Sequence, residues 1–404
     1  MTRITVTGLG MVTPAGLTPD ATWQTLLTGA STARRDESLD GLPVDISCRV
    51  PDFDPRRTVP GYGWRLDRFT AMAVLAARQA LTDAGLDPQT WDGARVGVVI
   101  GSGTASMERY GQEFAKIADG RPLDVSPLAI PRSVPNMSAA EIGLDTGATG
   151  PNFTVSTACA SGATAIGVAR DLLRAGTCDI VLAGGAESVR HPIPAACFHR
   201  MGVLSRRTEA PDQACRPFDS ARDGFVLSEG AAVLVLERAA HARARRVRPR
   251  AFLDGYAATC DAHHYAAPHP HGAGAAAAMT RALADAALHP HDIGHVNAHG
   301  TATRLNDLAE ARALRTVFPT PPPVTSVKGA IGHAIGAAGA IEAAVTVMTL
   351  QHGLIPPTAN HEDTDPDVDL DIVAKAPRPL RAQAAMSTSY GFGGQNAALV
   401  FTTC

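Results

Sequence analysis

Short apolar runs alternate with longer amphipathic segments along this chain. The apolar runs predict strands at residues 4–6, 95–100, 180–183, 231–236, 295–297, 324–327 and 397–401. Apolar residues recur at helical spacing over residues 69–84, 163–173, 275–287 and 341–350, which predicts helices there. Strands that alternate with helices and read as nearly continuous apolar runs are typical of an α/β protein with sheets covered on both faces.

The two halves of the chain repeat this order. Residues 80–88 close a helix in the first half, and residues 282–290 close a similar one in the second. A strand then leads into a turn, at residues 96–104 in one half and at 295–303 in the other. We therefore expect two copies of one αβ unit, residues 1–249 and residues 250–404, whose equivalent loops meet at a shared site. A chance likeness between alanine-rich helices is the alternative.

Two stretches between these elements, residues 106–137 and 186–222, show no clean periodicity. They are too long to be plain connections between helices and strands. Stretches of this kind usually line a site or an interface, so we expect them to do so here.

Composition places the chain among globular proteins of ordinary polarity. It has 404 residues, of which 45% are hydrophobic and 19% charged, with a formal net charge of −3. This charge argues against a general nucleic-acid binder, and the basic cluster at residues 243–248 is short. The seven cysteines show no CxxC spacing, so we expect neither a disulfide framework nor a zinc site. With no apparent signal peptide and no membrane-spanning run, a reducing cytoplasm is expected.

Cys159 lies at a predicted strand-to-helix corner. The β-prone run at residues 153–155 comes before it, and a helical segment begins near Ala160. The positive end of a helix dipole favours a thiolate, and small neighbours such as Gly162 leave room for a reactant. A buried structural cysteine is the alternative interpretation. The corner by itself does not decide between them.

Two histidines occupy matching positions in the second half. His299 directly follows a predicted strand, and His333 lies between glycine and alanine in a small-residue corner. Lys328 precedes His333 by five positions at the end of an apolar run, where it would be costly to bury without a partner. Glu310 and Asp307, on the helix after His299, are its candidate partners. Each residue alone could be structural, but two histidines at equivalent corners point to a site.

The last glycine cluster surrounds one phenylalanine, in Gly391-Phe392-Gly393-Gly394. Glycines let the backbone take unusual φ values and approach a ligand closely. Such a loop could aim a backbone N–H at a developing oxyanion. A tight hairpin before the terminal strand is the alternative.

These motifs together resemble the β-ketoacyl-[acyl carrier protein] synthase family of the thiolase superfamily. The likeness is strongest to the elongating enzymes of dissociated (type II) fatty-acid and polyketide systems. It rests on residues 157–162 with Cys159, residues 297–303 with Asp307 and Glu310, residues 327–333, and the Phe392 loop. Residues 5–14, 216–219, 223–225 and 355–358 also match, so the likeness runs essentially from end to end. The resemblance implies a thiolase fold, with duplicated halves in a five-layer αβαβα sandwich.

The resemblance also implies an acyltransferase that performs a decarboxylating Claisen condensation. Cys159 would take an acyl group as a thioester, with its N–H and that of Phe392 forming the oxyanion hole. His299 and His333 would steady the enolate formed when a malonyl thioester loses CO2. Lys328 and Glu310 would form an ion pair that orients the histidines. No metal and no resident cofactor are implied, because the phosphopantetheine arrives on an acyl carrier protein.

Substrate-contacting positions follow from the same resemblance. They are Thr301 and Thr303 along the phosphopantetheine arm, and Thr104, Ala129, Met107 and Gly393. Many family members have a large apolar side chain where this chain has Thr104, and an aromatic that crosses the dimer interface where it has Ala129. We therefore hypothesise a wider or more polar acyl tunnel. Asp261 and His264 match a segment near the site mouth.

The implied partners are the acyl carrier protein and a second subunit. The chain could form a homodimer, or be the catalytic half of a heterodimer with a chain-length factor that lacks the cysteine. A biosynthetic thiolase is disfavoured because the Phe392 loop holds no second cysteine. A synthase of the acetyl-CoA-starting type usually has one histidine and one asparagine where this chain has two histidines. No nucleic acid or membrane span is expected.

Overall fold

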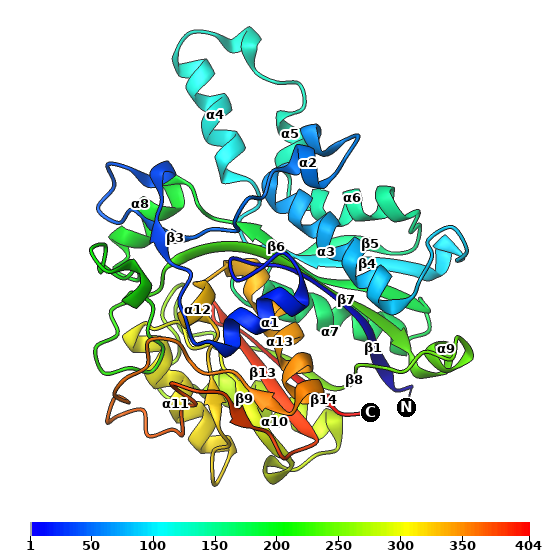
Figure 1. The fold of residues 1–404 in the computed structure, drawn as a ribbon, viewed down its shortest axis with the longest axis vertical. Helices are drawn as coiled ribbons and strands as arrows, with labels where there is room; N and C mark the ends of the chain where they lie inside the picture. Colours follow the sequence, from blue (N-terminus) through cyan, green and yellow to red (C-terminus); the bar gives the residue numbers. More distant parts are fainter. Residues whose placement is uncertain (1) are drawn as a thin grey trace.

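Two sets of five strands with the same spatial order form the centre of the molecule (Figure 1). The structure is a computed structural model that describes residues 2–404. The first set runs β5 (Asn152–Val155), β4 (Val96–Gly101), β6 (Ile180–Ser188), β7 (Leu227–Arg238), β1 (Ile4–Val12). The second runs β10 (Val324–Thr325), β9 (Ile293–Asn297), β13 (Ala384–Gly391), β14 (Gln395–Thr402), β8 (Ala251–Cys260).

The pairing directions repeat as well. In each set the first three strands are parallel and the last two pairings are antiparallel. The sets are joined where β1 pairs with β8, with Thr5 opposite Phe252 and Val6 opposite Ala251. Two units with one strand order and one set of pairing directions are what a duplicated fold produces.

Helices complete five layers. Between the two sets of strands lie α7 (Ser161–Arg174) and α13 (Ala338–His352), whose side chains share one core with both sets. Outside the first set lie α3 (Arg68–Ala84) and α6 (Met137–Thr146), and outside the second lie α10 (Ala273–Ala286) and α11 (Arg304–Val317). The predicted αβαβα sandwich of the thiolase fold is confirmed.

The two central helices approach each other closely because the residues at their contact are small. A Cβ placed on Gly162 of α7 would lie 2.7 Å from the backbone nitrogen of Ala340 in α13. Buried residues occupy every position of α13 from Ala338 to Leu350, which explains its nearly uniform apolar sequence. The start of α7, next to Cys159, is thus pressed against the second half of the chain.

The remaining elements lie around this framework. Figure 1 shows α4 (Met107–Ala118) standing away from the layers, at the top of the view, with α5 (Ala129–Ser133) at its base. The other helices and strands are α1 (Pro19–Leu27), β2 (Arg34–Arg35), β3 (Ile46–Cys48), α2 (Pro55–Thr58), α8 (Pro192–Arg200), α9 (Ala239–Ala244), α12 (Lys328–Ile331), β11 (Leu354–Ile355) and β12 (Arg378–Pro379). Among residues 2–404, we find no helix with both the length and the apolar character needed to cross a bilayer.

Each predicted strand and helix is present, and the differences that concern the central sheet are in β8, β13 and β10. Strands β8 and β13 were not predicted, because Asp254 and Gly255 interrupt one and Ala, Ser and Thr make up most of the other. Both pair on each side with other strands, so tertiary neighbours outweigh weak propensity. The strand predicted at residues 324–327 ends at Thr325, and Lys328 begins helix α12 instead of ending a strand.

Candidate active site

Cys159 lies on the corner between β5 and α7. The Ser161 hydroxyl holds this corner, since it accepts from the Thr157 N–H at 2.9 Å and donates to the Ala158 carbonyl at 2.6 Å. Ala158 has a φ of +50°, a conformation that non-glycine residues seldom adopt. The corner turns the Cys159 side chain toward the second half of the chain, where it is 6% exposed.

The structure brings the two predicted histidines to this thiol. His299 follows β9, and His333 lies between α12 and the short 3₁₀ helix η7 (Ile335–Ala337). The Cys159 Sγ and one ring nitrogen of each histidine lie within 4.8 Å of one another. The two imidazole rings meet edge to face, with centroids 5.3 Å apart. Both histidines are buried, so three reactive groups from the two halves share one enclosed space.

The same three donor atoms are the one group in the described chain that could hold a metal ion. One thiol and two neutral imidazoles are a donor set that zinc accepts. A transition metal would therefore compete with a substrate for these atoms.

Lys328 pairs with Glu342 and not with Glu310. Its Nζ forms an ion pair with the Glu342 carboxylate of α13, and both side chains are at most 2% exposed. The same Nζ donates to the carbonyl oxygen of His299 at 2.5 Å and lies 3.3 Å from its Nδ1. The predicted Lys328–Glu310 ion pair is therefore wrong.

Glu310 instead accepts backbone hydrogen bonds on the other side of the His299 turn. Its two oxygens accept from the N–H groups of His299 at 2.9 Å and Gly300 at 2.8 Å, and the Thr388 hydroxyl donates to it at 2.9 Å. Burial raises the pKa of Glu310 to about 7. Asp307, whose pKa burial raises to about 6, accepts from the Phe218 N–H at 2.8 Å and lies 3.5 Å from Arg222. Both carboxyl groups shape loops beside the site without reaching its centre.

Both histidines are neutral. Burial, and then the charge of Lys328, hold the pKa of His299 and that of His333 well below the usual 6.5. An ammonium group has hydrogen-bond donors only, so the Nδ1 of His299 must accept from Lys328. The ring proton of His299 is consequently on Nε2, which makes Nε2 a donor to whatever binds there.

The thiol of Cys159 is not acidified in the free protein. Burial raises its pKa to about 12, against the opposing effects of the Lys328 charge and the Phe392 N–H, which points at the sulfur. The prediction that the helix start eases thiolate formation is therefore outweighed by desolvation. A reaction at this sulfur needs a neighbouring base to take its proton. The neutral imidazole of His333 stands within reach, whereas His299 has no free lone pair, because its Nδ1 accepts from Lys328 and its Nε2 carries the proton.

The glycine loop after β13 packs tightly against the cysteine corner. A Cβ on Gly391 would lie 2.5 Å from the Thr157 carbonyl oxygen and 3.0 Å from the Cys159 nitrogen. Only a residue without a side chain allows this approach, which brings the Phe392 N–H beside the backbone of Cys159. Two N–H groups near one sulfur form the arrangement that an oxyanion hole requires.

A cavity of about 570 Å³ leads to these groups. Its wall includes Cys159, His299, His333, Thr301, Thr303 and Phe392, together with Asp261 and His264. The exposed Arg206 and Arg304 also line it. Residues from 198 to 206 form part of the wall, which confirms that the aperiodic stretch 186–222 lines a site.

Three predicted substrate positions, Thr104, Ala129 and Met107, are not on the wall of this cavity. The Thr104 hydroxyl donates to Glu187 at 2.9 Å, Ala129 is buried at the start of α5, and Met107 begins α4. Gly393, also outside the wall, donates its N–H to the Tyr265 carbonyl at 2.8 Å. The Thr104 hydroxyl is thus taken up by Glu187, and the wider or more polar acyl tunnel stays a prediction.

Several residues at the site were missed by sequence reasoning. Tyr390 packs edge-on against His299 and Phe225 against His333, with ring centroids 5.6 Å and 5.1 Å apart. Glu342 carried a usable signal, since it is the one charged residue within α13, and a buried charge needs a partner. The aromatic residues carried none, because packing partners are set by the fold.

Comparison with known proteins identifies the family. The model of the beta-ketoacyl synthase N-terminal domain matches residues 1–242, and that of the C-terminal domain matches residues 250–362. The chain belongs to the β-ketoacyl synthase family. It is 38% identical to a 3-oxoacyl-[acyl-carrier-protein] synthase 2 of Vibrio harveyi, over 99% of this chain and 98% of that one. The corresponding synthase of Synechocystis sp. is 39% identical, over 99% and 97%.

Solved structures of β-ketoacyl synthases superpose closely. A β-ketoacyl synthase from Burkholderia phymatum matches with a TM-score of 0.94 and 34% identity, over 100% of both chains. The ishigamide ketosynthase/chain length factor matches with a TM-score of 0.93 and 34% identity, over 100% of this chain and 99% of that one. A type II ketosynthase solved in complex with its acyl carrier protein has a TM-score of 0.93 and 30% identity, over 100% of both chains.

The partner of Lys328 can be tested by rescue. Glu342→Gln leaves a buried ammonium unpaired, so we expect a loss of about 3–5 kcal/mol in the free energy of unfolding. Adding Lys328→Met to Glu342→Gln should recover much of this loss, because it removes the unpaired charge. Added to Glu310→Gln, Lys328→Met should lower stability further. Urea unfolding gives the free energy of unfolding of all four variants. If Lys328→Met instead stabilised Glu310→Gln and destabilised Glu342→Gln, Lys328 would be paired with Glu310.

The state of the thiol can be tested by alkylation. Because the pKa of Cys159 is raised to about 12, its thiolate fraction should grow about tenfold per pH unit through the neutral and mildly alkaline range. The rate of iodoacetamide modification at Cys159, followed by peptide mass spectrometry, should rise in parallel without levelling off. A modification rate at Cys159 that reaches a plateau near neutral pH would show instead an acidified thiol. The modification of the exposed Cys197 serves as the internal reference.

Proposed function

We propose that this chain is a β-ketoacyl-[acyl carrier protein] synthase that lengthens an acyl chain by decarboxylating Claisen condensation. The supporting observation is the meeting of Cys159, His299 and His333 within 4.8 Å at the end of one cavity. Relatives named 3-oxoacyl-[acyl-carrier-protein] synthase 2, nearly 40% identical over the full length, support the same activity.

In the first half-reaction, Cys159 takes an acyl group from a carrier thioester. The neutral imidazole of His333 accepts the thiol proton, and the sulfur attacks the thioester carbonyl carbon. The N–H groups of Cys159 and Phe392 stabilise the oxyanion. The carbon–sulfur bond to the carrier breaks, its thiol leaves with a proton, and the acyl group stays on Cys159.

In the second half-reaction, a malonyl thioester binds in the same cavity and loses CO2. The bond to its carboxylate breaks, and the electron pair forms an enolate whose oxygen accepts hydrogen bonds from His299 Nε2–H and from His333. The carbanion attacks the acyl carbonyl on Cys159, and the carbon–sulfur bond breaks to release a β-ketoacyl thioester. The Cys159 sulfur leaves as a thiolate and takes up a proton from solvent. Neutral imidazoles suit this role, since a charged one would protonate the enolate more readily.

Lys328 and Glu342 act on this chemistry through His299. The ammonium group keeps Nδ1 of His299 an acceptor, and Glu342 balances the buried charge. Glu310 supports the backbone of the His299 turn. These are positioning roles, because neither carboxylate reaches the reacting atoms.

The acyl carrier protein supplies the substrates, and we assign no resident cofactor. Thr301 and Thr303, with hydroxyl oxygens 2.9 Å apart on the cavity wall, are placed to bind the phosphopantetheine arm. Arg206 and Arg304 are exposed beside this wall and suit the phosphate of that arm. The complex of a similar ketosynthase with its acyl carrier protein supports this partner.

The proposal extends to the pathway, the compartment and the remaining substrate positions. We place the enzyme in a type II polyketide or fatty-acid pathway in the cytoplasm, where its seven free cysteines would stay reduced. In the assembled dimer, Ala129, Met107 and Gly393 would contact the substrate, and Thr104 would lie at the start of the acyl tunnel. The junction of the two halves is placed between residues 249 and 250.

A heterodimer is the second candidate, in which this chain is the catalytic subunit beside a chain-length factor. The similarity to the ishigamide ketosynthase/chain length factor favours it. Large apolar side chains are exposed on and after α4 at Phe114, Ile117 and Leu123, on α5 at Ile130, and on edge strand β5 at Phe153. Such a surface fits a second subunit, either a copy of this chain or a homologue.

Substitution of Cys159 tests the mechanism. Cys159→Ala should abolish acyl transfer from a carrier protein, because no nucleophile remains. Cys159→Gln should lose condensation but keep malonyl decarboxylation, since a neutral amide resembles the acylated thiol. Radiolabelled acyl transfer and CO2 release measure the two half-reactions, with Cys197→Ala as the control at an exposed cysteine. Acyl transfer at the wild-type rate in Cys159→Ala would refute the proposal.

Mass and activity together test the subunit arrangement. The purified chain should run as a dimer of about twice 41.9 kDa and condense substrates alone if it is a homodimeric enzyme. Activity that appears only after co-expression with a cysteine-less homologue would assign it to the heterodimer. Light scattering with a condensation assay, on each preparation, separates the two.

A further inference from the structure

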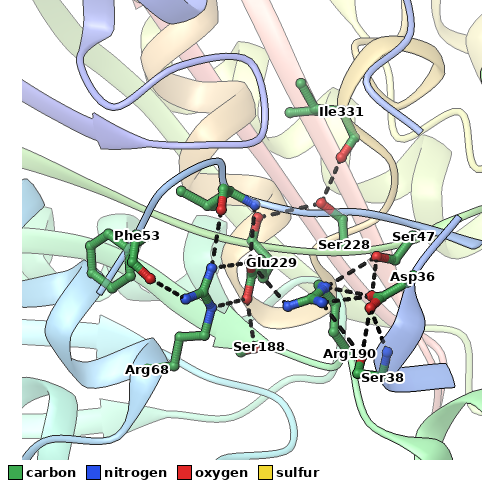
Figure 2. Close-up of polar contacts among 11 residues, drawn as sticks. Asp36, Ser38, Ser47, Phe53, Arg68, Ser188, Arg190, Ser228, Glu229 and Ile331 are labelled. Atoms are coloured by element: carbon green, nitrogen blue, oxygen red, sulfur yellow. Dashed lines mark hydrogen bonds and ion pairs between the residues drawn. The ribbon is translucent and has the colours of Figure 1, made fainter. Parts of the chain in front are cut away.

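The carbonyl oxygen of Ile331 is satisfied from outside its own helix. Ile331 is the last residue of α12 (Lys328–Ile331), and the final carbonyls of a helix have no N–H partner within it. The hydroxyl of Ser228 donates to this oxygen at 2.6 Å, and Ser228 is fully buried (Figure 2). The proposed mechanism has no use for this hydrogen bond.

A second bond holds the same segment on the far side of Gly332. The N–H of His333 donates to the Val226 carbonyl at 2.8 Å. Gly332 has a φ of +69° and a ψ of −168°, which side chains disfavour, and a Cβ there would lie 3.1 Å from that of Ser228. Ser228 at the start of β7 and Val226 just before it therefore hold residues 331–333 by one hydrogen bond each. These bonds lie directly beside the residue that carries the imidazole of His333.

The strand that carries Ser228 is itself fixed by a buried carboxylate. Glu229 accepts from Arg68 through Nε and Nη2, both at 2.7 Å, from Ser188 Oγ at 2.9 Å and from Val50 N–H at 3.0 Å (Figure 2). Burial opposes its charge, but Arg68, with help from Arg190, holds the pKa of Glu229 below its usual range. The carboxylate is charged and fully paired, which is the condition under which a buried polar network stiffens its surroundings.

The network extends to the N-terminal part of the chain. Arg190 binds Asp36, with Nη2 2.7 Å and Nε 2.8 Å from the same carboxylate oxygen, and donates to Ser47 Oγ at 3.0 Å. Arg68, at the start of α3, also donates to the Phe53 carbonyl at 2.6 Å. Figure 2 shows Ser228 as the residue that connects this network to Ile331. Separate segments of the chain thus converge on the Glu229 carboxylate, which is adjacent in sequence to Ser228.

We propose that Ser228 is a positioning residue for His333 and Lys328, whose hydroxyl sets the placement of α12 and the following turn relative to Cys159. Its strand is held by the Glu229 network, so the hydroxyl holds the end of α12 at a fixed position relative to that strand. The inference rests on the proposed function, in which His333 binds the enolate oxygen and Lys328 orients His299. It assigns a role to a residue in no contact with substrate.

Ser228→Ala tests this in a Cys159→Gln parent, where no thiol chemistry contributes. The probe is malonyl-pantetheine, and CO2 release is measured across pH. We expect kcat to fall by about tenfold or more, as is common when the partner that orients a functional group is removed, with KM unchanged.

The pH profile separates positioning from loss of fold. The histidines must be neutral, and burial keeps the pKa of His333 well below 6.5, so the parent should lose activity only at acidic pH. A loosened segment admits water, which raises this pKa toward its usual value. The acid limb of Ser228→Ala should therefore move to higher pH.

Thr146→Val in the same parent is the matched control. It removes a buried hydroxyl that donates to the Ile142 carbonyl at 2.7 Å, in α6 on the outer layer. It should change the melting temperature but neither kcat nor the acid limb. The inference is overturned if Ser228→Ala has the same kcat and the same acid limb as the parent. It is also overturned if Ser228→Ala lowers kcat no more than Thr146→Val does. A folded parent that releases no CO2 refutes the proposed function, and this inference falls with it.

Discussion

The burial of one ammonium group constrains most of the active site. Lys328 is 1% exposed, and a charge so placed costs several kcal/mol unless it is paired and hydrogen-bonded. The structure meets this requirement with a carboxylate from α13, the carbonyl of His299 and its Nδ1. These contacts fix the tautomer of His299, and burial, together with the same charge, holds the pKa of both imidazoles low, so that both are neutral. The contacts that satisfy the buried ammonium group thus also set the protonation states of His299 and His333.

The duplicated fold brings these groups together. Equal strand orders place α7 and α13 in the same central layer, so the cysteine of one half meets the lysine, glutamate and histidines of the other. Small residues at the helix contact, such as Gly162 against Ala340, allow the close approach. A larger side chain at that contact would separate the nucleophile from the imidazoles without touching either. Reactivity therefore depends on packing between helices as much as on the reactive residues.

The site combines burial with preorganised polar groups. Desolvation raises the pKa of the Cys159 thiol to about 12, which leaves the free protein with an unreactive sulfur. The same dry surroundings strengthen the two N–H groups and the two imidazoles that would stabilise negative charge on a substrate. Such a site favours the bound, charged intermediates over the resting thiolate. The Glu229 network, remote from substrate, supplies the rigidity that this arrangement needs.

The linear pattern of residues was sufficient for the α/β class, the duplication and the corner residues Cys159, His299 and His333. These follow from local periodicity and from motifs in which chemistry and spacing coincide, because such signals lie within a few residues of one another. The partner of Lys328 was not found this way, although Glu342 stands out as the one charged residue within an apolar helix. Glu310 and Glu342 are both glutamates on helices of the second half, and the side from which each helix approaches His299 decides which of them meets Lys328. The thiol's pKa likewise depends on burial by distant segments, which overrides the local helix start. Tertiary packing decided those points, since buried electrostatics are set by which groups meet and by how much water they lose.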